Sequence, residues 1–191
     1  MNDQPTANTA RGTNHSDVQP GFLSLAAKTA VCHTLTYFIM GALAYNFLHY
    51  AELIARPCSG MRPITDPLVR AGSLFQPLRG VLFAAVFYPI RERLFGVKNG
   101  WLLMGWMLVA LGILGTFAAA PGSMEGLIYL TAPVAEQLRG YLEIATQAVL
   151  LSALLCYWVN HPTKKWLNWL SGAAFFMVAA LTAMALLMPA R

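Results

Sequence analysis

Several ionisable and amide side chains interrupt or border the long apolar stretches of this 191-residue chain. Glu136, Arg139, Glu143 and Gln147 follow one another at steps of three, four and four residues, which places them on one face of a helix. An ionisable residue inside a membrane usually faces a cavity or a partner. Glu143 is therefore the leading candidate on this face, and Arg139, one turn away, is its expected counter-ion.

A second polar face runs along the first apolar stretch, again at helical spacing. This polar stripe consists of His33, Tyr37, Gly41, Tyr45, His49 and Glu52. The opposite side of the same stretch is apolar and suits contact with lipid. The pattern is typical of a helix face that packs against other helices, where Tyr and His find hydrogen-bond partners.

Alternation of the spans brings these faces together. The first apolar stretch ends, and the second and fourth begin, on the same side of the membrane, whichever way the chain is oriented. Their polar residues then share one half of the bilayer and predict a ligand-binding pocket. The residues assigned to this pocket are His49, Glu52, Gln76, Arg79, Glu125, Glu136, Gln137, Arg139 and Glu143.

The two arginines of the predicted pocket, Arg79 and Arg139, lie beneath the basic loop between the first and second spans. Such positive charges suit an anionic group such as a carboxylate, a phosphate or a lipid headgroup. The leading hypothesis is a protein that binds an anionic small molecule or lipid, with transport of that ligand as its extension. The alternative is a non-catalytic accessory or assembly subunit whose polar residues only fasten helices together. Membrane lipid and a second copy of the chain, or a larger membrane complex, are the expected partners, and nothing resembles a nucleic-acid face.

Enzymatic and cofactor-dependent functions receive less support from the sequence. An enzyme acting on lipid could use His49 or Glu143 as a general base, but no hydrolase or metalloprotease motif accompanies them, so no catalytic residue is assigned. A haem protein is a further alternative, with His33 and His161 as the only plausible histidine pair on one side of the membrane. The scattered cysteines lack metal-ligand spacing, and we predict no metal site and no cofactor.

Composition dictates the elements that position these residues. Hydrophobic residues make up 57% of the chain, charged residues 11%, and the mean hydropathy is +0.53, whereas soluble domains carry about 25% charged residues. An integral membrane protein is the class that remains. Unbroken apolar runs of about 20 residues predict membrane-spanning helices rather than barrel strands. We expect an all-α bundle of five spans, at about 30–51, 72–90, 101–120, 138–159 and 168–188.

The remaining predictions concern organisation and orientation. Residues 1–21 are polar and predict a disordered cytoplasmic tail, followed by a single transmembrane domain over 22–191. The second and fourth spans begin with the similar segments Leu78–Leu82 and Leu138–Leu142, which suggests two parallel helical-hairpin repeats plus an extra first helix. Lys and Arg are slightly more frequent on the side of the N-terminal tail, which favours a cytoplasmic N-terminus in a bacterial inner membrane.

Overall fold

The computed structural model of the protein describes residues 19–47, 62–63 and 65–188, without the side chain of Arg139. Every regular element in these ranges is helical. The elements in chain order are α1 (Phe22–Phe47), α3 (Pro67–Arg70), α4 (Gly72–Phe87), the 3₁₀ turn η2 (Tyr88–Ile90), α5 (Arg91–Leu94), α6 (Gly100–Val109), the π-helical turn η3 (Ala110–Leu114), α7 (Met124–Tyr129), α8 (Val134–Asn160) and α9 (Lys165–Leu187).

Four helices are long and apolar enough to cross a membrane, which supports the predicted class of helical membrane protein. They cover Phe22–Phe47, Gly72–Leu94, Val134–Asn160 and Lys165–Leu187. The third predicted span differs, because α6 has ten residues and η3 adds five. Together they reach at most about 22 Å, less than the roughly 30 Å of a hydrocarbon core. The predicted total of five spans therefore stays a prediction.

Two predicted boundaries move outward. Helix α1 begins at Phe22, eight residues before the predicted start, because Leu25, Ala26 and Thr29 are already buried against other helices. Helix α8 begins at Val134, directly after Pro133. Proline is well tolerated next to the first turn of a helix, where its missing N–H leaves no bond unmade.

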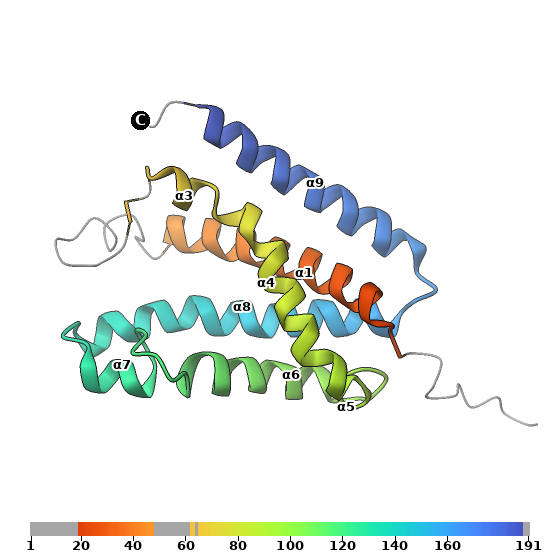
Figure 1. Ribbon diagram of the computed structural model, residues 1–191, viewed down its shortest axis with the longest axis horizontal. Helices are drawn as coiled ribbons and strands as arrows, with labels where there is room; N and C mark the ends of the chain where they lie inside the picture. The colour runs from red at the N-terminus through yellow and green to blue at the C-terminus, as the bar shows by residue number, and fades with distance from the viewer. Residues whose placement is uncertain (1–18, 48–61, 64, 189–191) are drawn as a thin grey trace, which may run out of the picture.

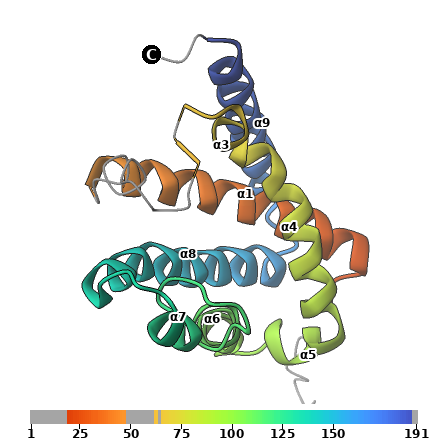
Figure 2. The ribbon, with the colours of Figure 1, turned by 60° about the vertical axis from the view of Figure 1, so that its left-hand side comes forward.

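The helices alternate in direction, as the sequence predicts. In Figure 1, α1, α6 and α9 run one way along the bundle, and α8 runs the other. Figure 2 places α8 between α1 and α6, with α4 crossing α1 and α9 on the outside. The end of α1 and the beginning of α8 thus lie at one end of the bundle (Figure 1), whereas the beginning of α4 lies beside the middle of α1, with Gly72 against Tyr37.

Close packing is concentrated at the opposite end. The buried cluster there joins the first half of α1 to the ends of α4 and α8, around Leu25, Phe87, Leu94, Leu155 and Trp158. Closely packed interiors leave few voids. The half of the bundle in which the sequence places the polar residues is therefore the half outside this main core.

Glycines lie at two contacts between helices, and the approach at Gly80 is the closer one. A Cβ at Gly80 of α4 would collide with backbone atoms of Ala30 in α1, and one at Gly105 of α6 would touch Ser152 of α8. Small residues at such crossings let membrane helices approach closely. The main helix pairs are accordingly α1–α4, α6–α8 and α1–α8. Gly140, the counterpart of Gly80 in the proposed repeat, has open space at its Cβ, so the two similar segments pack differently and the duplication remains a prediction.

Candidate functional site

A partly open cavity of about 110 Å³ lies where α1, α4, α6 with its π turn, and α8 meet. A water molecule occupies about 30 Å³ in the liquid, so the space suits three or four waters or a molecule of a few non-hydrogen atoms. Most of its wall is apolar. The lining residues are His33, Arg79, Phe83, Leu108, Gly112, Ile113, Ile144, Gln147, Ala148 and Leu151.

His33 supplies a polar atom that has no protein partner. Its ring is buried, and its Nε2 lies 3.1 Å from Oε1 of Gln76, whose own Nε2 donates to the carbonyl oxygen of Gly72 at 3.0 Å. Because the Gln76 oxygen can only accept, His33 Nε2 must carry the proton. In the neutral imidazole Nδ1 is then a bare acceptor, and it has no hydrogen-bond partner within the described part of the chain.

Arg79 supplies a positive charge at the same cavity. Its guanidinium lies over the ring of Phe83, with Cζ 5.5 Å from the ring centroid, and Phe83 in turn packs edge-on against His33 at 5.0 Å. The side chain is largely exposed, and among the described residues no carboxylate lies within ion-pair distance of it. None of the described lining residues is acidic. The cavity therefore has one cation in its wall, and the unpartnered acceptor of His33 lies buried beside it.

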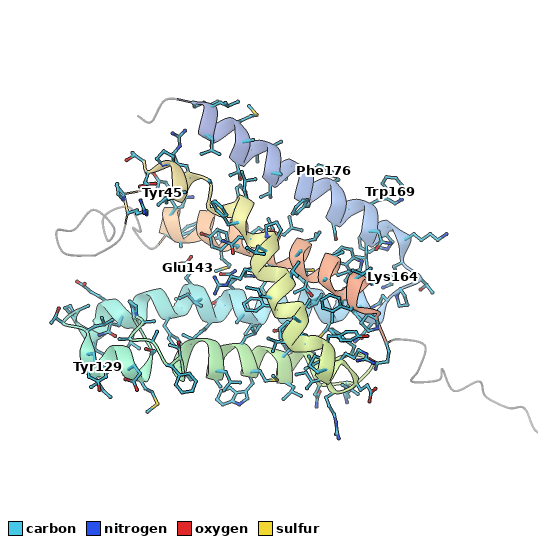
Figure 3. The ribbon with its side chains drawn as sticks, viewed as in Figure 1. Tyr45, Tyr129, Glu143, Lys164, Trp169 and Phe176 are labelled. Atoms are coloured by element: carbon cyan, nitrogen blue, oxygen red, sulfur yellow. The ribbon has the colours of Figure 1, made fainter. Side chains whose placement is uncertain are left out.

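Glu143 lies close to this arrangement without lining the cavity. It is half-buried about 14 Å along α8 from the start of that helix, at 1.5 Å per residue. Figure 3 shows it projecting from α8 on the side that faces α1. It forms no ion pair with a described residue, and the side chain of its predicted counter-ion, Arg139, lies outside the description.

Other predicted pocket residues lie elsewhere or serve the loop that precedes α8. Gln137 is buried, accepts a hydrogen bond from the Gly122 N–H and donates one to the Ala132 carbonyl. Glu125 is in the first turn of α7, and Glu136 is half-exposed in the first turn of α8. His49 and Glu52 lie outside the described residues.

The polar stripe of α1 is buried only in part. His33 is enclosed, and the hydroxyl of Tyr37 lies against Gly72 of α4. Tyr45, two turns further, is 53% exposed. The predicted packing role of the stripe therefore applies to the part that α4 crosses.

Sequence reasoning missed the apolar members of the cavity, above all Phe83 and Gly112. The Cβ position of Gly112 has no neighbour within 4 Å, so this glycine does not serve a close contact between helices. It lies in η3, and π-helical turns occur frequently at functional sites. Two glycines three residues apart, Gly112 and Gly115, were the available signal for an irregular helix.

The described residues give no metal-binding group of three or more His, Cys, Asp or Glu side chains. The alternative haem ligands each bond a protein group through one ring nitrogen: His33 bonds Gln76, and His161 Nδ1 bonds the Tyr157 carbonyl.

No protein-family model matches the chain, and comparisons with curated proteins and with solved structures show no similar protein. The class that the fold supports is a helical membrane protein with four apolar helices long enough to cross a bilayer.

Proposed function

We propose that this membrane protein binds a small oxyanion, free or as a lipid headgroup, in the cavity beside His33 and Arg79. The observation that carries the proposal is the unbalanced charge of Arg79 at a cavity whose described lining has no acid. Arg79 lies seven residues, about 10 Å, from the start of α4; an arginine at the centre of a membrane helix costs about 2.5–3.5 kcal/mol on the insertion scale, and one nearer the end costs less. A bound anion would offset that cost and would use the planar fork of the guanidinium.

The free acceptor on His33 narrows the class of ligand. The Nδ1 atom of His33 is buried, so a ligand hydroxyl reaches it only if the ring shifts toward the cavity; because a neutral imidazole Nδ1 accepts a hydrogen bond and cannot donate one, such a contact favours a ligand with a hydroxyl group. Hydrogen phosphate, hydrogen carbonate and a phosphate monoester headgroup each combine an anionic oxygen with a hydroxyl. Sulfate has the size and charge for Arg79 but lacks the proton that His33 would accept.

The test measures the stability of protein reconstituted in zwitterionic lipid nanodiscs. It compares two anions of similar size, and it compares substitutions at two arginines. Hydrogen phosphate should raise the free energy of unfolding by about 2.7 kcal/mol at 100 times its Kd, and sulfate should have a much smaller effect. Arg79→Gln should abolish the stabilisation. Arg91→Gln is the control, because Arg91 also lies over an aromatic ring, that of Tyr88, but does not line the cavity.

The lipid arm of the test uses phosphatidic acid, a monoester, against phosphatidylglycerol, a diester without a phosphate hydroxyl. Preferential retention of phosphatidic acid through Arg79 would identify a lipid headgroup as the ligand. If the Arg79 and Arg91 variants respond alike to all anions, the cavity is not an anion site. Uptake of labelled phosphate into proteoliposomes tests the extension to transport.

The predicted location and orientation belong to the same proposal: a bacterial inner membrane, with the N-terminus in the cytoplasm. Labelling of Cys58 by a membrane-impermeant reagent in intact cells tests the orientation. The loop that contains Cys58 is expected on the periplasmic side. Protection of Cys58 in intact cells, followed by labelling after lysis, would reverse the orientation.

An accessory subunit is the second candidate, and α9 is the feature that favours it. This helix packs on α1 and α4 along one side only, and Trp169 and Phe176 on its surface are 82% and 74% exposed (Figure 3). A partner helix or lipid would cover them. Native mass spectrometry of the complex extracted from its own membrane distinguishes a monomer, a homodimer and a larger assembly.

A further inference from the structure

The segment between η3 and α8, residues 115–133, is apolar to an unusual degree for a loop between membrane helices. Glu125 is its only charged residue. Its large side chains point outward: Phe117 is fully exposed, and Met124, Ile128 and Tyr129 are 67–69% exposed. Figure 3 shows Tyr129 directed away from the bundle. We refer to residues 115–133 as the cap segment.

The cap segment lies beside the beginning of α8. It occupies the part of the bundle length that α6, which is shorter than α8, does not reach. Gly105 of α6 packs against Ser152 of the antiparallel α8, so the end of η3 at Leu114 is level with about residue 143. Gly122 then lies against Gln137 and Tyr141, further toward the start of α8. Figures 1 and 2 both show α7 alongside this part of α8. One side of α8 is apolar here as well, with Leu138 and Leu142 exposed.

The backbone around Ser123 in the cap segment is hydrogen-bonded within the turn and to Gln137 of α8. Ser123 Oγ accepts from the N–H groups of Gly126 (2.9 Å) and Ala120 (3.2 Å) and donates to the Ala120 carbonyl at 2.7 Å. Gln137 bonds the Gly122 N–H at 3.3 Å and the Ala132 carbonyl at 2.9 Å. Non-helical backbone at membrane depth requires such partners, because each unsatisfied group costs several kcal/mol in lipid.

The glycines of the segment serve the same compact turn. Gly122 has a φ of +84°, a conformation that L side chains rarely adopt, and a Cβ at Gly126 would collide with the Ala120 carbonyl. The stretch Pro121–Gly126 thus has a structural purpose: it folds a short, internally bonded turn whose outer surface is apolar.

We propose that the cap segment is embedded in the membrane and completes the short third span. Phe117, Met124, Ile128 and Tyr129 contact lipid acyl chains near the interface. The loop at the opposite end of α6 provides the contrast, because residues 91–98 contain Arg91, Glu92, Arg93 and Lys98 and suit water and headgroups. This inference does not depend on anion binding at the cavity, and the two can fail separately.

The test is a depth measurement by nitroxide spin labels in full-length protein in liposomes, with the native cysteines replaced by serine. Labels are placed at Phe117→Cys and Ile128→Cys. Phe176→Cys on α9 is the lipid-exposed reference, and Thr163→Cys, exposed in the loop between α8 and α9, is the aqueous reference. Molecular oxygen partitions into lipid, whereas a hydrophilic nickel chelate stays in water.

The labels in the cap segment should have the same accessibility as the label at position 176, with high access to oxygen and low access to the nickel chelate. A match to Thr163 would overturn the proposal in favour of an aqueous loop. Protection from both reagents would overturn it in favour of a protein partner. The unmodified chain provides a second measurement: a membrane-partitioned diazirine should label residues 115–133 as strongly as α9, and leave residues 160–164 unlabelled.

Discussion

Substitution of Gly80 by alanine tests the helix crossing on which the cavity depends. The added Cβ would lie 2.8 Å from the Ala30 nitrogen and 3.0 Å from the Thr29 oxygen. Ordinary non-bonded contacts lie at about 3.5–4.0 Å, so α1 and α4 must move apart by at least about 0.7 Å. Both neighbours are backbone atoms and cannot rotate away as a side chain could. Such overpacking costs about 1–3 kcal/mol.

Helix propensity acts in the opposite direction and must be separated from this cost. Alanine in place of glycine stabilises an exposed helix interior by about 1 kcal/mol. Gly172→Ala in α9 and Gly41→Ala in α1 isolate this contribution, because neither position has a neighbour within 4 Å of its Cβ. Gly80→Ala should therefore be about 1–3 kcal/mol less stable than the two control variants.

The assay is reversible unfolding in mixed micelles, followed by far-ultraviolet circular dichroism during titration with denaturing detergent. The three variants and the parent protein are compared at equal lipid content. If Gly80→Ala is as stable as Gly172→Ala, the α1–α4 crossing is not as close as the structure shows, and the geometry of the cavity fails with it.

Two further predictions concern individual hydrogen bonds. Gln76→Leu should lower the free energy of unfolding by about 1–3 kcal/mol, because it leaves the buried His33 Nε2–H without a partner; unchanged stability in the same titration would contradict this pairing. At Asp66, the backbone N–H of Leu68 and then Arg62 lower the pKa of the carboxyl below its usual value of about 3.9. The stabilising contribution of Asp66 is therefore present above about pH 3.9 and is lost as the pH falls through the lowered pKa of the folded protein. The amide resonance of Leu68 should report this titration in the parent protein but not in Asp66→Asn.

Hydropathy predicts the long helices because a span of about 20 apolar residues has no other stable conformation in lipid. It misplaces the end of the third predicted helix, because residues 101–120 are almost all apolar but helical structure ends at Leu114. The helix ends there for local reasons: the π turn closes with a bond from Gly115 N to the Ala110 carbonyl, and the chain then turns through Gly122. Apolarity measures preference for lipid and does not record where a backbone leaves the helix.

The candidate site could be predicted to the level of a helix face but not to the level of partners. Periodicity placed His33 on the packed face of α1 and Arg79 near the beginning of α4. It could not show that one glutamine, Gln76, bonds His33, whereas the other, Gln137, bonds the backbone of the preceding loop. The two glutamines have the same sequence context, each shortly before a Leu-Arg-Gly segment. The packing of neighbouring helices determines which partner each glutamine bonds. The spacing of residues along one helix contains no information about that packing.

The position of Arg79 illustrates how packing and chemistry are linked in this bundle. Gly80 is the next residue along α4, so their side-chain directions differ by about 100° around the helix axis. Once Gly80 presses against Ala30, Arg79 can no longer face α1 and must project beside the crossing, over Phe83 and into the cavity wall. The same crossing brings His33 to Gln76. The adjacent pair Arg79–Gly80 therefore fixes both the cation and the free acceptor of the proposed site. A change at Gly80 should weaken anion binding even though a glycine contributes no group to the ligand.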